Sequence, residues 1–437
     1  MVGECFCAPL NDADIADVTH FVEEGSPLDV EASQRSTTVY LIDRRLDMLP
    51  AELSSGLCSL HSGDDRFAVS VFWEFSASTG ALLSQRMART IIRNSYTLSY
   101  EEAHTVVFSH DHSSFVKGLG AEKLDFVPSV RSAVGRTNSL HLLRSRREYD
   151  RVKEAIGYLY RLASRMRNDR TQRGSVELES LEEVRFHVNG EAVESVEIEH
   201  EVEMHQTIAE WMIFANHCVA AYLYEHLPGA ALLRRHIPPN PSNFKTLVET
   251  AAEKGFSIET HSSGALASSL ARANDPADPQ VNLMLRSLAT RAMNEAEYIS
   301  SGDFTPADYH HYGLAVDFYT HFTSPIRRYA DIVVHRQLLH FLEKRRSPSQ
   351  SKIEDSSPLF RTRPVAELAV HINNQTRASK NIQRDASEWF RAIYFKDKEV
   401  SAMGMIYGIR DNSLLVFVPD YRVRAPVFLT DKDGGIT

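Results

Sequence analysis

The segment HQTIAEWMIFANHCVAAYLYEHL, residues 205–227, constrains the fold of this chain more than any other. Its apolar residues cover more than one stripe of a helix, which is typical of a helix that is buried on most of its sides. A chain of 437 residues, 43% of them hydrophobic, is long enough to bury such a helix in a large core. We therefore expect one large domain and a smaller one. Glu210 lies inside this helix and, as a buried acid, needs a partner.

The first hundred residues favour strands. Residues 66–75, RFAVSVFWEF, alternate apolar side chains, and residues 36–41, STTVYL, are rich in β-branched types. Ser99 and Glu102 then have the spacing of a capping box. This spacing predicts the start of a helix and places Tyr100 near its first turn.

The rest of the chain is predicted to be mainly helical, with a few strands. The final segment should form short strands joined at Asp411 and Asn412, as at the beginning of a small barrel. Apolar residues at helical spacing indicate the helices. The predicted helices cover about 148–168, 282–299 and 364–395, and the predicted strands cover 193–204 and 312–322.

The sequence TSPIRRYAD places two arginines where a helix is predicted to begin. Ser324 suits the N-cap and Pro325 the first helical position, so Arg327 and Arg328 should fall in the first turn. The helix dipole already puts partial positive charge there, so two arginines cost stability unless an anion joins them. Free backbone N–H groups and a planar guanidinium together suit a phosphodiester. Spacing alone leaves surface ion pairs with acidic neighbours open as the alternative.

Charge and cysteine content exclude several classes of protein. The net charge of −10 argues against a protein that coats nucleic acid non-specifically, although it is compatible with a local basic channel. Four cysteines without CxxC spacing predict a reducing, intracellular setting. No stretch approaches the roughly 20 apolar residues of a membrane helix. We expect a cytoplasmic protein without a membrane partner, with the nucleus left open as an alternative.

Residues 310–336, HHYGLAVDFYTHFTSPIRRYADIVVHR, resemble the signature block of the RNase II/RNB family of 3′–5′ exoribonucleases. The similarity includes residues 15–60, TLSYEEA at 97–103 and the terminal segment, so it covers nearly the whole chain. ADVTHFV, DRRLDMLP and HHYGLA are most similar to the eukaryotic exosome-associated members, and in particular to their cytoplasmic paralogue. The resemblance implies an α+β fold, in which an RNB catalytic domain with a mixed sheet flanked by helices precedes the start of a C-terminal OB-type β-barrel.

The resemblance also implies a domain organisation and a reaction. Members of this family hydrolyse single-stranded RNA processively to nucleoside monophosphates in RNA decay. The implied partners are single-stranded RNA and the exosome core, but not DNA. The implied parts are an atypical N-terminal segment (1–14), an RNB catalytic domain incomplete at its N-terminus (15–345), a linker and helix that complete it (346–400) and a partial OB-fold RNA-binding domain (401–437).

Four residues match positions of the family's site, and Arg328 and Ser324 adjoin one of them. Arg327 matches an arginine that contacts the scissile phosphate and Tyr100 a tyrosine near the active centre, so the resemblance implies that both are catalytic. Tyr40 matches an aromatic residue that packs against the terminal nucleotide. Glu210 matches a glutamate on the channel wall, where either a 2′-hydroxyl of RNA or a structural salt bridge would satisfy it. The implied RNA-binding residues are Tyr40, Glu210, Arg328 and Ser324.

The family also implies magnesium, but the ligands that hold it are not identifiable in this chain. Hydrolysis by paired Mg²⁺ ions requires several converging carboxylates, which the family supplies from an Asp-rich motif upstream of IADVTHFV. Residues 1–14, MVGECFCAPLNDAD, do not contain that motif. Asp12, Asp14 and Asp17 are poor replacements, because Asp14 and Asp17 differ in strand parity. The alternative to an active enzyme is therefore an inactive RNA-binding or exosome-interacting isoform or fragment.

The arginines between Arg144 and Arg173 have two interpretations. They would suit a face that guides RNA toward a channel. The solvated face of a long helix explains them at least as well.

Overall fold

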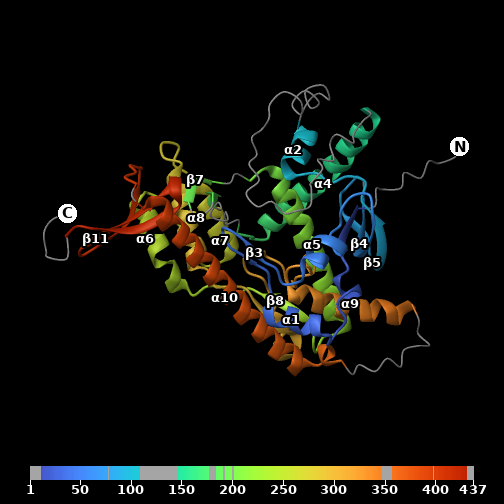
Figure 1. Cartoon of the computed structure of the whole chain (residues 1–437). Helices are drawn as coiled ribbons and strands as arrows, with labels where there is room; N and C mark the ends of the chain where they lie inside the picture. The colour runs from blue at the N-terminus through green and yellow to red at the C-terminus, as the bar shows by residue number, and fades with distance from the viewer. Residues whose placement is uncertain are drawn as a thin grey trace.

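Helices and antiparallel strands build an α+β fold, which confirms the predicted class (Figure 1). A computed structural model of the chain describes residues 11–76, 78–108, 146–176, 184–189, 192–198, 201–346, 357–396 and 398–430. Over these ranges the strands pair in five separate sheets, and every strand pairing is antiparallel, so the expected mixed sheet is wrong there. No helix in the described ranges is both long and apolar enough to cross a bilayer. The α-helices are α1 (Pro27–Arg35), α2 (Tyr100–Phe108), α4 (Arg146–Gln172), α5 (Glu203–His226), α6 (Lys245–Glu253), α7 (Ser263–Arg272), α8 (Gln280–Ala292), α9 (Tyr329–Arg346) and α10 (Thr362–Phe395).

The N-terminal sheet has β4 at its centre, between β1 and β5. The alternation in β4 behaves as predicted, since Val69, Val71 and Trp73 are all buried on one face. On the opposite face, Asp14 of β1 lies across from Ser70. The sheet therefore turns one apolar face to the core, and its opposite face carries the contact between Asp14 and the fully buried Ser70. The strands are β1 (Asn11–Ala16), β2 (Val39–Tyr40), β3 (Arg45–Leu46), β4 (Asp65–Phe75), β5 (Leu82–Arg93), β6 (Val184–Asn189), β7 (Ala192–Ile198), β8 (Leu232–Arg235), β9 (Glu297–Ser300), β10 (Met405–Arg410), β11 (Ser413–Val418) and β12 (Val423–Phe428).

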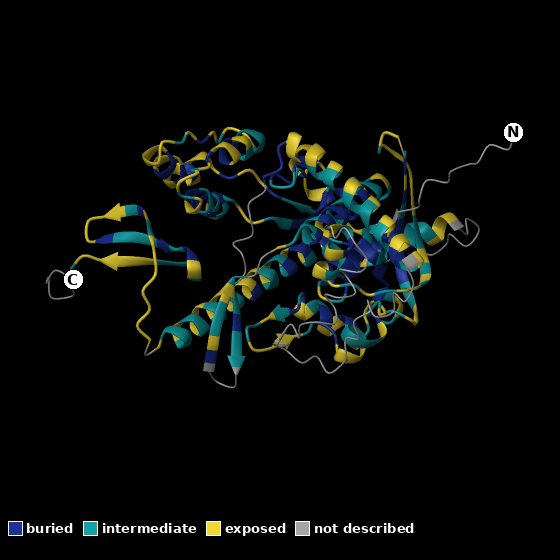
Figure 2. Ribbon diagram, turned by 90° about the horizontal axis from the view of Figure 1, so that it is seen from above, coloured by how far each residue is buried: buried dark blue, intermediate teal, exposed yellow. Residues whose placement is uncertain are grey.

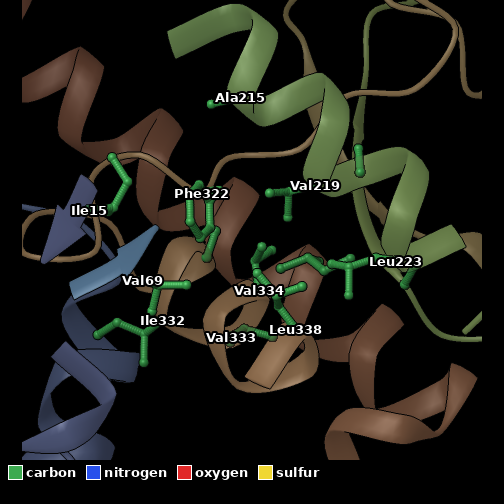
Figure 3. Packing of buried hydrophobic residues seen from close by; sticks show 14 of the residues in the cluster. Ile15, Val69, Ala215, Val219, Leu223, Phe322, Ile332, Val333, Val334 and Leu338 are labelled. Atoms are coloured by element: carbon green, nitrogen blue, oxygen red, sulfur yellow. The ribbon is translucent and has the colours of Figure 1, made fainter. Parts of the chain in front are cut away.

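The main core forms where α5 and α9 meet the N-terminal sheet (Figure 3). α5 is buried on several sides, as its sequence predicts, and α9 is almost completely buried over its first three turns. Phe322, in the segment just before α9, is fully buried among them. This packing fixes the beginning of α9 relative to the sheet. The side chains involved include Ile15, Val69, Ala215, Val219, Leu223, Ile332, Val333, Val334 and Leu338.

A second, smaller core holds α6, α7 and α8 against the terminal sheet. Tyr407 of β10 and Phe417 of β11 are the buried residues that link them. The turn predicted at Asp411 and Asn412 joins β10 to β11, and β12 completes a three-stranded antiparallel sheet. Figure 2 shows this sheet apart from the densest buried region, with much of its surface exposed. The OB-type barrel stays a prediction.

Three local predictions are wrong. Residues 312–322 form turns and isolated bridges instead of a strand, because the chain folds back where the His311 N–H donates to the Val316 carbonyl, at 2.8 Å. Ala315, between them, has a φ of 53°. The strand predicted over 193–204 ends at Ile198, and α5 already begins at Glu203. The predicted helix over 282–299 ends at Ala292, and its last residues form β9 on β8.

Candidate functional site

A pocket of about 310 Å³ opens between β1, the β2–β3 hairpin and the turn that precedes α9. Tyr40, Ser324 and Arg327 all line it, so the structure brings together three of the residues implied by the resemblance. Tyr40 lies more than 280 positions before the other two in sequence, so the pocket exists only in the folded chain. Its other lining residues are Asp14, Ile15, Ala16, Thr38, Arg45, Asp47, Ser54, Cys58, Ser59, Leu60, Thr323, Pro325 and Ile326.

The turn over residues 324–328 differs from the prediction, because α9 begins only at Tyr329. The N–H groups of Arg327 and Arg328 both donate to the Ser324 carbonyl at 3.1 Å, which closes a turn ahead of the helix. Asp331, in the first turn of α9, accepts the Ser324 N–H at 2.6 Å. The arginines therefore precede the helix start, and the acid that complements the helix dipole is Asp331.

The segment before β2 clamps the same turn from the other side. The Arg327 carbonyl accepts the Thr38 N–H at 3.0 Å and the Thr37 hydroxyl at 3.2 Å. The Tyr329 N–H donates to the Ser36 carbonyl at 2.9 Å. Since Tyr40 follows two residues after Thr38, these bonds set the spacing between the tyrosine and the arginine of the pocket.

Arg328 is used internally and does not line the pocket. Its Nε and Nη2 donate to the two oxygens of Asp331 at 2.8 and 2.7 Å, and the Asp331 side chain is fully buried. Burial alone would lower the pKa of Arg328, but the Asp331 carboxylate outweighs it and the pKa is raised. Arg328 therefore stays charged and holds the turn. Its contact with RNA stays a prediction, and the geometry does not support it.

Arg327 is the residue of this turn that faces solvent. Its side chain donates to the Ser324 hydroxyl in a long bond of 3.4 Å. Among the described residues it has no carboxylate partner. A guanidinium without a counter-ion on a pocket wall is suited to an external anion.

The two other predicted residues lie outside the pocket. Tyr100 begins α2 as expected, and the capping box of Ser99 and Glu102 is present, with bonds of 2.7 and 3.1 Å. The Tyr100 ring stacks on His205, with centroids 4.0 Å apart. Glu210 on α5 forms a buried, two-bond ion pair with Arg170 on α4. Of the two interpretations of Glu210, the geometry supports the structural salt bridge.

The carboxylates near the pocket are already engaged. Asp14 accepts the Ser70 hydroxyl at 2.5 Å, and Asp47 pairs with Arg45 at 2.6 Å. Asp17 lies beyond β1, buried against Arg89 at 2.6 Å. Burial and the neighbouring Asp14 charge raise the pKa of Asp12.

These residues do not fit a pair of Mg²⁺ ions. Within the described ranges, no group of three or more His, Cys, Asp or Glu side chains could hold a metal ion. Paired magnesium requires several free carboxylate oxygens at one point. No step of a reaction can be derived through metal from the donors seen here.

Sequence reasoning missed the residues that support Arg327. Asp331 is three positions after Arg328, a spacing at which an acid and a base contact each other on a helix. This spacing could have predicted the ion pair from the sequence. Thr37 and Thr38 gave no signal, because their role depends on a contact with a turn 290 residues away.

The chain is similar to known proteins over almost its full length. The family described as "RNB domain" matches residues 13–344. "Exosome complex exonuclease RRP44 homolog A" of Arabidopsis thaliana is 38% identical over 421 residues, which are 96% of this chain and 40% of that protein. "Exosome complex exonuclease RRP44" of Homo sapiens is 34% identical, over 96% of this chain and 39% of that protein. The chain thus spans about two fifths of the length of these curated relatives.

Solved structures share the fold. RNase R of Mycoplasma genitalium, in complex with ribose-methylated single-stranded RNA, has a TM-score of 0.76 and 21% identity, and covers 98% of this chain and 61% of that one. Yeast Ssd1, described as a pseudonuclease, has a TM-score of 0.72 and 21% identity, over 98% of this chain and 46% of that one. The same architecture therefore occurs in a nuclease and in a pseudonuclease.

Proposed function

Because the chain belongs to the RNB domain family, we propose that it acts in the 3′–5′ degradation of single-stranded RNA and holds the RNA 3′ end in the pocket of Arg327 and Tyr40. One observation carries the proposal. Arg327 is exposed on the wall of the pocket that Tyr40 also lines, and it has no carboxylate partner among the described residues.

The pocket chemistry suits the end of a polynucleotide. A guanidinium can donate two parallel hydrogen bonds to one phosphate, and an aromatic ring offers a stacking surface to any base. Tyr40 is 43% exposed, so its ring is accessible. A volume of about 310 Å³ is at the lower end of the range for small-molecule sites, which is about 300–1,000 Å³. We therefore assign one terminal nucleotide to the pocket, with its phosphate at Arg327.

Magnesium-dependent hydrolysis is the activity of the proposed enzyme, but the described residues supply only part of it. Arg327 would hold the phosphate, and Asp331 and Arg328 would keep the turn in place. The carboxylates beside the pocket are bonded to other side chains and do not form a site for two magnesium ions.

A second candidate is an RNA-binding protein of the same fold that does not hydrolyse RNA. The engaged state of Asp14 and Asp47 favours it, and the fold likeness to the pseudonuclease Ssd1 is consistent with it. Both candidates share the pocket and differ only in the chemical step.

Partners and location follow from the proposed role in RNA decay. We propose association with the exosome core, because the curated relatives are named as exosome complex exonucleases. We propose a cytoplasmic location, with the nucleus as the alternative.

One set of measurements tests the function. Fluorescence anisotropy with a 5′-labelled single-stranded RNA should give an affinity that falls about 10- to 150-fold in Arg327→Gln, since bonds to a charged group contribute about 1.5–3 kcal/mol. Arg345→Gln, an exposed arginine on α9, is the matched control and should bind normally. Equal affinities for the two variants would contradict the assignment of the pocket.

The chemical step is tested separately. The wild-type chain is incubated with the same RNA and Mg²⁺, and the products are separated on a denaturing gel. Stepwise shortening to mononucleotides supports the exoribonuclease, and intact RNA with normal binding supports the second candidate.

A further inference from the structure

α4 carries an arginine-rich stripe on the side opposite its buried side. Residues alternately three and four positions apart share one face of a helix. The inward face runs through Tyr149 and Ala163, both buried. All the residues of the outward face are exposed. We call this face the α4 stripe, and its defining residues are Arg147, Arg151, Tyr158, Arg161, Arg165 and Asn168.

The stripe is a local excess of positive charge in an acidic chain. α4 contains eight Lys and Arg against four Asp and Glu, while the whole chain has a net charge of −10. Two of the basic residues, Arg167 and Arg170, are paired with acids of α5. On the stripe, Glu154 is the acidic residue, and the four stripe arginines have no carboxylate partner among the described residues.

The spacing of these arginines costs stability unless an anion is present. Arg147 and Arg151 are four positions apart, and so are Arg161 and Arg165. Like charges at this spacing destabilise a helix. Exposed acids lie near both pairs, since Asp150 is three positions after Arg147 and Asp169 is four positions after Arg165. Among the described residues neither acid forms a salt bridge with these arginines, so a polyanion bound along the stripe would offset both repulsions at once.

An aromatic ring lies among the arginines. Tyr158 is 39% exposed, and the Arg161 guanidinium lies 4.4 Å from its ring centroid. Arg165 donates to the Thr79 carbonyl in the β4–β5 turn, which orients this side chain without neutralising it. An open hollow of about 550 Å³ lies beside them, lined by both arginines, by the polar side chains of Tyr160, Ser164, Asn168 and Gln172, and by one acid, Asp169.

We propose that the α4 stripe binds the phosphate backbone of single-stranded RNA, at a site separate from the Arg327 pocket. This inference rests on the proposed function. Single-stranded nucleic acid is held by arginines on its phosphates and by rings that stack on its bases, and the stripe offers both. Arg147 and Arg165 are 18 residues apart, which is about 27 Å along a helix, enough for several nucleotides. An acidic polypeptide would meet the charge but would leave Tyr158 without a base to stack on.

The stripe and the pocket share no lining residue, so they can be tested independently. The test variant is Arg151→Gln/Arg161→Gln in the full chain, which removes one member of each like-charge pair. The matched control is Lys344→Gln/Arg345→Gln, two exposed basic residues at the end of α9. The probe is a 5′-fluorescein-labelled, 20-nucleotide single-stranded RNA, titrated at several salt concentrations.

The slope of log affinity against log salt is the decisive quantity. Two phosphate contacts to a single strand contribute about 1.4 to it, so the stripe variant should bind more weakly and with a slope shallower by about 1.4. Its thermal unfolding midpoint should stay close to that of the wild type, because the relieved repulsion and the lost contact between Arg161 and Tyr158 are opposite in sign and each worth at most about 1 kcal/mol. The control variant Lys344→Gln/Arg345→Gln should keep the slope of the wild type.

Three results would overturn the inference. The first is the same slope in the stripe variant and the control. In that case, weak RNA binding by Arg327→Gln would still support the Arg327 pocket as the RNA site and the proposed function. The second is loss of RNA binding that merely follows a lower unfolding midpoint, which would assign the stripe a structural role. The third is stripe-dependent binding of poly-glutamate without binding of RNA, which would favour an acidic protein partner.

Discussion

Replacing Asp331 by asparagine should destabilise the chain strongly, although the substitution changes hardly any volume. The Asp331 side chain is fully buried and accepts three hydrogen bonds, two from Arg328 and one from the Ser324 N–H. Removing its charge leaves the Arg328 guanidinium, whose side chain is 22% exposed, without a counter-ion. Breaking a buried pair in this way costs about 3–5 kcal/mol, and the remaining exposure of Arg328 favours the lower end, about 3 kcal/mol.

Urea unfolding followed by circular dichroism measures this effect. At an m value of about 3 kcal/mol/M or more, a loss of about 3 kcal/mol lowers the urea midpoint by up to about 1 M. The control is Asp385→Asn, because Asp385 pairs with Arg384 on an exposed surface, where the expected cost is below about 1 kcal/mol.

A second variant tests whether the unpaired Arg328 guanidinium causes the loss of stability. Arg328→Met/Asp331→Asn removes the stranded guanidinium as well, so it should recover most of the lost stability, while the asparagine side-chain oxygen still accepts the Ser324 N–H. A midpoint of Asp331→Asn equal to that of Asp385→Asn would contradict this role of the Arg328–Asp331 ion pair, and so would a double variant that is less stable than the single one.

Three further predictions follow from individual contacts. Glu210→Gln should lower the unfolding free energy by about 3 kcal/mol, because the Arg170 charge is left buried; a chemical denaturation curve like that of the wild type would contradict this. Gly302→Ala should destabilise by about 1–3 kcal/mol, because an added Cβ would overlap a backbone carbonyl; calorimetry without a lower midpoint would exclude the overlap. Cys58 and Cys218 should resist iodoacetamide at pH 8 in the native chain, because burial raises their thiol pKa to about 12 and about 11; labelling detected by mass spectrometry before unfolding would show that they are accessible.

The local parts of the fold could be predicted because they depend on neighbouring residues. The capping box at Ser99 and Glu102, the buried face of β4 and the long helices α4, α5 and α10 follow from spacing and periodicity. The family likewise follows from motifs that are continuous in sequence, above all the block at residues 310–336.

Other features depend on contacts across the chain. Residues 312–322 have the composition of a strand, but the His311 N–H bonds to the Val316 carbonyl, so the segment turns back instead of extending. A propensity describes what a segment prefers alone, and a tertiary contact can override it.

The sequence by itself determined the class of fold, the family and the identity of Arg327 and Tyr40 as candidates. Only the tertiary structure decided how the polar groups are matched: Arg328 to Asp331, Glu210 to Arg170, and Arg327 to no carboxylate among the described residues. The physical reason is that burial makes an unpaired charge costly, so each buried acid or base is satisfied by whichever partner the fold brings within about 3 Å. Sequence spacing does not specify that partner when it lies on another element.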